Sequence, residues 1–202
     1  MFFAIRRKLK RVVRRPALSA VREALRIPSG QISMEEARFL GSLLPALPAA
    51  RPIIEVGTLF GWSTRVMALY KPLDAPLITV DMYCWNPLGL SDADHFAITS
   101  SILEESKQTL NVTQVRIDKD VFYREYAGPA PSLIFLDADH TYEATRADLQ
   151  WANSFPDTIV CLHDYRPEWP GVIAAVDEFG GPASIVGTLC TLKPKAERFR
   201  VQ

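Results

Sequence analysis

Short apolar runs alternate with stretches of helical periodicity along most of the chain. Five runs have the composition of buried strands, at residues 53–56, 77–80, 112–117, 132–136 and 158–162. Helical patterns lie between or after them, at residues 63–70, 93–110, 141–152 and 172–179. Strands and helices that alternate in this way form a parallel sheet with helices on its faces. The pattern therefore predicts an α/β fold.

The two ends of the chain carry other patterns. Residues 2–15 place apolar side chains at helical spacing among Arg and Lys, which predicts a basic amphipathic helix ending before Pro16. A second helix is expected at residues 18–26, and Ser33 with Glu36 has the pattern of a capping box for a helix through Leu44. Two strand-like runs, 184–191 and 198–201, close the chain. We expect an N-terminal helical extension over residues 1–50 and one α/β domain over residues 51–202.

Charge changes this picture only at the N-terminus. The chain has 202 residues, 48% of them hydrophobic, which is the size of one well-buried domain. Basic and acidic residues balance at 23 each, so composition disfavours nucleic acid as a partner. The segment 6–15, however, has Lys or Arg at seven of its ten positions. Three interpretations stay open for residues 1–15: attachment to an anionic membrane surface, a homodimer contact, or a solvated leader. The apolar face favours the first.

Cysteine usage and hydropathy bear on localisation. The three cysteines are widely spaced and include no C-x-x-C pair, as expected of a protein in a reducing compartment. No apolar run approaches the roughly 18 residues of a membrane-spanning helix. These features predict a cytoplasmic protein, with peripheral contact at the inner face of the membrane if residues 1–15 bind lipid.

A glycine-containing turn follows the first predicted strand. The strand contains Glu55 and is followed by Gly57, and Gly61 and Ser63 lead into the next helix. In an open parallel sheet, ligands bind where strand carboxyl ends meet helix N-termini, and glycine allows close approach of the backbone. Asp81 follows about 25 residues later, near the spacing at which nucleoside-binding folds place an acid against ribose hydroxyls. A tight turn and an Asp cap without any ligand would explain the same residues.

Acid and imidazole groups follow two other predicted strands. The fourth strand runs into Asp137, Asp139 and His140, and the fifth runs into His163 and Asp164. Adjacent parallel strands would present these groups at one edge of the sheet. Oxygen ligands with one imidazole suit Mg²⁺, Mn²⁺ or a similar divalent ion. Each residue alone could be a helix cap, but the two-strand cluster favours a metal or catalytic site.

Three motifs occur in order at these strand ends: EVGTLFGWST at 55–64, LDADHTYE at 136–143 and HDY at 163–165. Together they resemble the class I S-adenosylmethionine-dependent methyltransferases, especially a bacterial group near the catechol and caffeoyl-CoA O-methyltransferases, over roughly residues 53–179. The resemblance implies a Rossmann-like three-layer α/β/α sandwich with a mostly parallel seven-stranded sheet whose last strand is antiparallel. It also implies S-adenosylmethionine as the cofactor.

The resemblance further implies roles for individual residues at the cofactor. Glu55 and Gly57 would border its methionine part, Ser63 would contact its carboxylate at a helix start, and Asp81 would hold the ribose. Asp120 would lie near the adenine, with Asp118 as a competing position. The cofactor-binding set is thus Glu55, Gly57, Thr58, Gly61, Ser63, Asp81 and Asp120.

The family's metal positions fall on Asp137, His163 and Asp164. Catechol-type enzymes carry Asp and then Asn at the last two, so His163 leaves both the presence and the identity of a metal open. Where that branch has a lysine base, this chain has His140, which could accept a proton from a substrate hydroxyl or merely orient the loop. Leu59 replaces the middle glycine of the commoner E-x-G-x-G-x-G pattern, as is usual in the catechol-like branch.

The sequence therefore predicts O-methylation of a hydroxyl on a small molecule or glycan, with His140 and Asp137 as catalytic residues and assistance from a divalent metal such as Mg²⁺ if one binds. Tyr83, Trp85 and residues 86–94 would form a wall for the acceptor opposite residues 165–169, unless these aromatic residues serve ordinary packing. A nicotinamide-dependent oxidoreductase is disfavoured because G-x-G-x-x-G is missing. A metal-dependent hydroxylase or hydrolase on the same scaffold, or a binding protein without catalysis, stays open.

Overall fold

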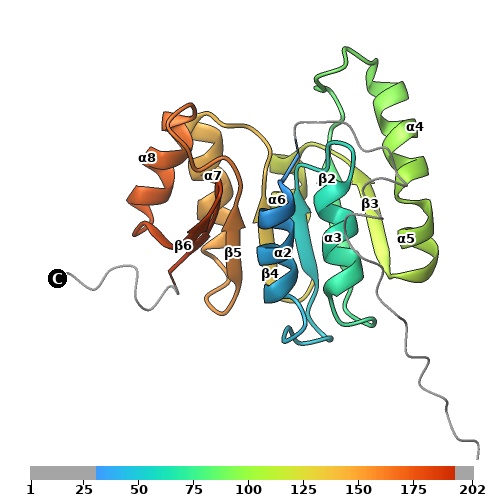
Figure 1. Ribbon diagram of the computed structural model, residues 1–202, viewed down its shortest axis with the longest axis horizontal. Coiled ribbons are helices and arrows are strands. Elements are labelled where there is room, and N and C mark those ends of the chain that lie inside the picture. The colour runs from blue at the N-terminus through green and yellow to red at the C-terminus, as the bar shows by residue number, and fades with distance from the viewer. Residues whose placement is uncertain (1–30, 194–202) are drawn as a thin grey trace, which may run out of the picture.

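One seven-stranded sheet organises the computed structural model, which describes residues 31–193 (Figure 1). The strand order is β3-β2-β1-β4-β5-β7-β6. β1 to β5 pair in parallel, and β7 runs antiparallel to both of its neighbours, which confirms the predicted sheet. The strands are β1 (Ile53–Val56), β2 (Leu77–Asp81), β3 (Val112–Arg116), β4 (Leu133–Leu136), β5 (Ile159–Leu162), β6 (Pro182–Val186) and β7 (Leu189–Leu192).

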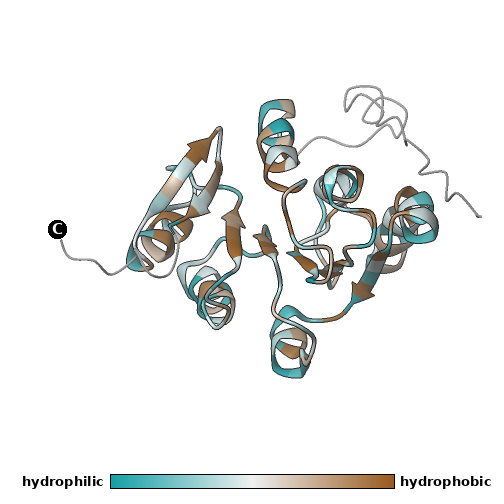
Figure 2. Cartoon of the chain, turned by 90° about the horizontal axis from the view of Figure 1, so that it is seen from below, coloured by the Kyte–Doolittle hydropathy of each residue, from teal (hydrophilic) through white to brown (hydrophobic). Residues whose placement is uncertain are grey.

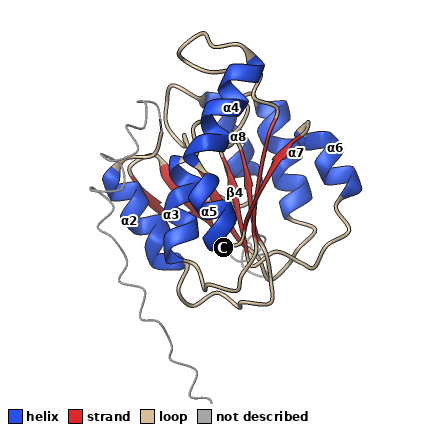
Figure 3. Ribbon diagram, turned by 90° about the vertical axis from the view of Figure 1, so that its right-hand side faces the viewer, coloured by secondary structure: helices blue, strands red, loops and turns tan. Residues whose placement is uncertain are grey.

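Helices cover both faces of the sheet. They are α2 (Met34–Leu43), α3 (Trp62–Tyr70), α4 (Asp92–Ile102), α5 (Glu104–Thr109), α6 (Lys119–Glu125), α7 (Tyr142–Ala152) and α8 (Pro170–Glu178). Figure 3 shows α2, α3 and α5 on one side of the strands and α6 and α7 on the other. None of the helices in the described range has the length and apolar character needed to cross a membrane.

Successive strand residues supply two separate apolar cores, because side chains alternate across a strand. Ile53 packs with Leu40 of α2 and Trp62 of α3, whereas Ile54 packs with Leu149 of α7 and Val176 of α8. In Figure 2 the strands stand out as apolar segments between helices with hydrophilic outer surfaces. This two-faced burial produces the three-layer sandwich.

The structure differs from the predicted elements at three places. The helix expected over residues 93–110 is interrupted between α4 and α5, where Leu103 is fully buried against Gly61. The single strand expected over 184–191 is wrong, because Gly187, at φ 61°, turns the chain into a β6–β7 hairpin. The seven-residue α6, capped by Asp118, was not predicted. The helices expected at residues 2–15 and 18–26 and the strand at 198–201 lie outside the described residues.

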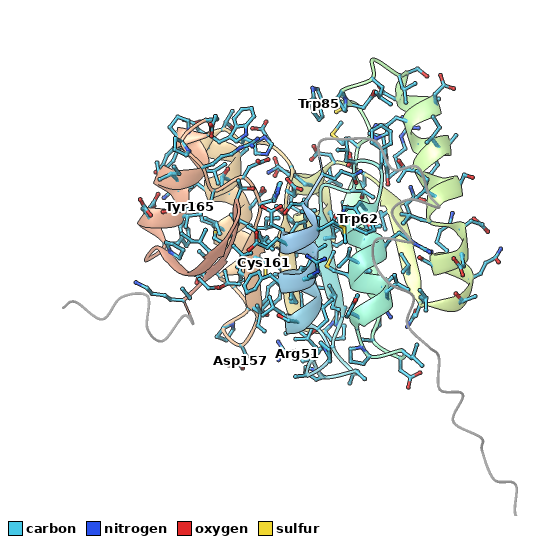
Figure 4. All side chains as sticks on the ribbon, in the orientation of Figure 1. Arg51, Trp62, Trp85, Asp157, Cys161 and Tyr165 are labelled. Atoms are coloured by element: carbon cyan, nitrogen blue, oxygen red, sulfur yellow. The ribbon has the colours of Figure 1, made fainter. Side chains whose placement is uncertain are left out.

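Arg51 ties the strands together at the edge where they begin. Its guanidinium donates to the carbonyl oxygens of Ala130, Pro131 and Asp157. Figure 4 places Arg51 and Asp157 at this edge and Trp85 at the opposite one, where the strands end. The candidate site lies at the edge that carries Trp85.

Candidate functional site

Gly57 joins the ends of β1 and β4. Its φ of 95° is left-handed, and a Cβ there would lie 1.8 Å from the carbonyl oxygen of Asp137. Gly57 N–H donates to Val80 O of β2, and Asp137 N–H donates to Val56 O. Only glycine permits this approach. The glycine turn and the acidic loop after β4 are therefore in direct contact.

The Asp81 carboxylate holds the loops after β1 and β2. Its Oδ2 accepts from Thr58 N at 2.8 Å and from Leu59 N at 2.9 Å, and its Oδ1 accepts from Tyr83 N at 2.7 Å. Leu59 and Tyr83 both have positive φ, at 48° and 62°. Left-handed backbone costs a non-glycine residue about 1–2 kcal/mol. Asp81 thus offsets strain at two positions. Its contact with Tyr83 N is the turn cap that the sequence left open, whereas its contacts with Thr58 N and Leu59 N were not predicted.

His95 of α4 supports the same two strained residues from the other side. The ring is fully buried, with Nε2 2.9 Å from Leu59 O and Nδ1 3.3 Å from Tyr83 O. Tyr83 is also fully buried and packs on His95, so it belongs to the core and forms no acceptor wall. Trp85 is 69% exposed and remains available for that role.

Glu55 acts through its neighbours at the start of α3. It is fully buried, and its oxygens accept from Ser63 Oγ at 2.5 Å and from Thr64 Oγ1. Burial outweighs these hydrogen bonds and raises the pKa of Glu55 to about 7. The Gln31 carboxamide oxygen accepts from Trp62 N, so the α3 N-terminus already receives an oxygen ligand. The direct contact predicted between Glu55 and a cofactor stays a prediction.

The two aspartates after β3 have different surroundings. Asp118 caps α6 and accepts from Asp120 N at 2.9 Å and Val121 N at 3.1 Å. The Asp120 side chain is 63% exposed and lies 3.3 Å from Lys119 Nζ. Asp118 therefore has a structural partner, and Asp120 keeps most of its carboxylate open to solvent.

The acid and imidazole groups after β4 and β5 meet as predicted. His163 Nδ1 lies 3.5 Å from Asp137 Oδ1 and 3.4 Å from Asp164 Oδ2. His140 Nε2 lies 2.9 Å from the same Asp164 oxygen and 3.9 Å from Asp137 Oδ1. Asp164 has a left-handed φ of 59°, and the Trp169 ring stacks on His140 with centroids 4.4 Å apart. One small volume thus holds two carboxylates and two imidazoles.

Proximity shifts the proton affinities of all four groups. Burial alone would lower the histidine pKa values, but the Asp137 and Asp164 carboxylates outweigh it and raise the pKa of His140 to about 9 and that of His163 to about 12. Burial would raise the carboxyl pKa values, but the imidazoles hold the pKa of Asp137 and Asp164 below the usual range. The cluster therefore consists of charged pairs near neutral pH.

Two residues from the ends of the described range complete the cluster. Glu36 of α2 is 4% exposed, and its Oε2 lies 3.5 Å from His163 Nε2. Thr188, in the β6–β7 turn, lies 3.1 Å from that nitrogen through Oγ1 and donates to Glu36 Oε1 at 3.0 Å. The capping box with Ser33 is confirmed, but it gave no sign of this second role for Glu36. Nothing local in the sequence links Glu36 to Thr188.

The donor set fits a divalent cation. Ligand atoms of Asp137, His163 and Asp164 lie within 4.8 Å of one another. Asp164 Oδ1 and His140 Nε2 are buried and make no hydrogen bond within residues 31–193, although both lie in ion-pair contacts. Arg166 Nη2 lies 2.9 Å from Asp164 Oδ1, so a bound ion would share that carboxylate with the guanidinium. The predicted metal residues are therefore brought together.

Comparison with known proteins gives a consistent result. The profile of a family described as "Methyltransferase domain" matches residues 54–165, more than half of the chain. A catechol O-methyltransferase of Niastella koreensis is 33% identical over 118 residues, 56% of this chain and 48% of that protein. The chain thus spans about half the length of this curated relative.

Solved structures show the same fold. The O-methyltransferase from Bacillus cereus in complex with SAH aligns with a TM-score of 0.65 and 20% identity, over 90% of this chain and 94% of that chain. The O-methyltransferase TomG from Streptomyces achromogenes, involved in tomaymycin synthesis, was solved in complex with SAM. It aligns with a TM-score of 0.62 and 20% identity, over 87% of this chain and 88% of that chain.

Proposed function

Since the chain belongs to the methyltransferase-domain family, we propose that it transfers a methyl group from S-adenosylmethionine to a hydroxyl oxygen of a small molecule or glycan. The observation that carries the proposal is the contact between Gly57 and Asp137, which places the glycine turn directly beside the two-carboxylate, two-imidazole cluster. Methyl transfer requires a cofactor site and a site that activates a nucleophile to lie next to each other.

The cofactor, when bound, supplies an electrophilic methyl group on its sulfonium. Gly57, Thr58 and Gly61 form the turn that approaches it, and Ser63 lies at the helix end suited to a carboxylate. The Asp81 carboxylate accepts hydrogen bonds from three backbone N–H groups. A carboxylate can accept about four, so Asp81 could accept one more from a ribose hydroxyl. The open side chain of Asp120 is assigned to the adenine end.

Asp137, His163 and Asp164 would hold a divalent metal. Such an ion, when bound, makes an acceptor hydroxyl more acidic and fixes its direction. His140 accepts the proton released from that hydroxyl, and stacking on Trp169 holds its ring in place. With both carboxylates free, the raised pKa keeps His140 protonated near pH 7. Positive charge beside Asp137 and Asp164 opposes this effect, so metal binding favours the neutral form that can act as a base.

Isothermal titration with S-adenosylhomocysteine, with and without Mn²⁺, tests the cofactor half. We expect micromolar affinity, weakened in Asp81→Asn and unchanged in Asp157→Asn at the opposite edge of the sheet (Figure 4). Absence of binding under every metal condition would contradict the proposal.

Radiolabelled S-adenosylmethionine with a panel of catechols and sugars tests the chemistry. Methyl transfer to a hydroxyl supports the proposal. Tight cofactor binding without any transfer would favour the non-catalytic binding protein, and turnover of the panel without the cofactor would favour a hydroxylase or hydrolase.

The basic segment 1–15 is assigned to a negatively charged membrane surface, on the strength of its charge and spacing alone. Sedimentation with phosphatidylglycerol vesicles, compared between the full chain and a chain lacking residues 1–15, tests this. Equal sedimentation of both would contradict it. Light scattering of the same two samples tests whether the segment joins a homodimer.

A further inference from the structure

The hydrogen-bond chain around His163 fixes which of its ring nitrogens carries a proton. Glu36 Oε1 can only accept, so the Thr188 hydroxyl gives it the proton, over 3.0 Å. The oxygen of that hydroxyl must then accept from His163 Nε2–H, over 3.1 Å. Neutral His163 consequently has its lone pair on Nδ1.

That Nδ1 points at two atoms that also only accept. Asp137 Oδ1 lies at 3.5 Å and Asp164 Oδ2 at 3.4 Å. The two carboxylate oxygens would repel such a lone pair, so in the metal-free protein a proton on Nδ1 lies between them, and a bound cation would take the place of that proton. Histidines that ligate metals characteristically donate their other ring N–H to a hydrogen-bonded partner in this way. The contacts of His163 match that arrangement.

We infer that Glu36 and Thr188 are positioning residues that present His163 Nδ1 as a ligand, and that the site selects a first-row transition ion such as Mn²⁺ over Mg²⁺. The inference rests on the proposed metal site and adds residues from α2 and the β6–β7 turn. Imidazole nitrogen suits transition ions, whereas Mg²⁺ prefers a shell of oxygens. Gly187 allows the turn to reach Glu36, since a Cβ at that position would lie 2.5 Å from Oε1.

Thr188→Val and Thr188→Ser form the test pair. Valine removes the hydroxyl at nearly constant volume, and serine restores it. Ser33→Ala is the matched control, because it removes the cap that Ser33 Oγ provides to Glu36 N and leaves the His163 chain intact. The probe is Mn²⁺ alone, titrated by calorimetry and observed by pulsed electron paramagnetic resonance, with Mg²⁺ as competitor.

We expect Mn²⁺ to bind the wild type more tightly than Mg²⁺ and to show nitrogen coupling that His163→Asp removes. Thr188→Val should weaken Mn²⁺ roughly 10- to 100-fold, the usual cost of losing an outer partner of a ligand. Thr188→Ser and Ser33→Ala should bind like the wild type.

Equal Mn²⁺ affinity in Thr188→Val, no nitrogen coupling, or equal affinity for Mg²⁺ would overturn the inference. S-adenosylhomocysteine is titrated in parallel. If it fails to bind while the Mn²⁺ pattern holds, the proposed methyl transfer fails and the inference stands. If it binds and Mn²⁺ does not, the inference fails and the cofactor half of the proposal stands.

Discussion

Replacement of Asp81 separates a structural role from a cofactor role at one position. Asp81→Ala removes three hydrogen bonds to backbone N–H groups, of 2.7 to 2.9 Å. A net value of about 1 kcal/mol each is a fair estimate, because the side chain is only half-buried and water can replace part of the loss. The free energy of unfolding should fall by about 3 kcal/mol, which lowers Tm by roughly 6–12 °C for a domain of this size.

Asp81→Asn is the sharper variant. Its single carbonyl oxygen can keep Thr58 and Leu59 N–H, but its amide then faces Tyr83 N–H, donor against donor. We expect the free energy of unfolding to fall by about 1–2 kcal/mol, which is less than the fall expected for Asp81→Ala. Urea unfolding measures the stability of both variants, and titration with S-adenosylhomocysteine is run where they are fully folded.

The two measurements can fail independently. If Asp81→Ala unfolds at the wild-type urea midpoint, the three N–H contacts contribute nothing to the free energy of unfolding, and the structural role of Asp81 is refuted. If both variants are destabilised as expected while the folded Asp81→Asn binds S-adenosylhomocysteine like the wild type, Asp81 does not hold the ribose. Loss of affinity in Asp81→Ala alone would not discriminate, because the glycine turn itself would be disturbed.

Three further variants test other parts of the site. Glu55→Gln should flatten the pH dependence of stability. The folded pKa of Glu55 is raised from 4.5 to about 7, so its contribution to the free energy of unfolding is complete below pH 4.5 and falls by about 3 kcal/mol as the pH rises from 4.5 to about 7. Identical pH profiles in urea unfolding would contradict this. Gly57→Ala should lower the free energy of unfolding by more than about 3 kcal/mol, because the added Cβ would overlap Asp137 O. A Tm within 2 °C of the wild type, or about 1 kcal/mol, would refute this prediction. His140→Gln should slow methyl transfer roughly 10²- to 10⁴-fold with unchanged S-adenosylhomocysteine affinity; an unchanged rate excludes His140 as the base.

The parts of the fold that depend on local apolar runs could be predicted from the sequence. β1 to β5 and the helices that follow β1, β4 and β5 were expected within a few residues. β1, β2, β4 and β5 consist mainly of apolar residues and are mostly buried, whereas β3 is partly exposed and carries Thr113, Gln114 and Arg116. The β6–β7 hairpin was not separated, since a single glycine in an apolar run does not reveal a turn. The break at Leu103 depends on packing against Gly61, which no local pattern encodes.

Strand ends also explain why much of the site was predictable. Asp137, His163 and Asp164 follow adjacent parallel strands, so topology alone brings them together. The Asp81 cap on the following turn was among the interpretations of the sequence, but its contacts with Thr58 N and Leu59 N could not be predicted, because they depend on the positive φ of Leu59.

Glu36 is the clearest example of a site residue that the sequence did not reveal. The capping box accounts for Glu36 through its Oε2 contact with Ser33 N, and nothing suggests that its other oxygen has a distant partner. That partner, Thr188, lies 152 positions away in the turn concealed by the misassigned strand. Because Thr188 and Glu36 together orient His163, the first described helix and the last hairpin meet at the predicted metal site. If the metal site is real, residues of the first described helix and the last hairpin contribute to it through their contacts with His163.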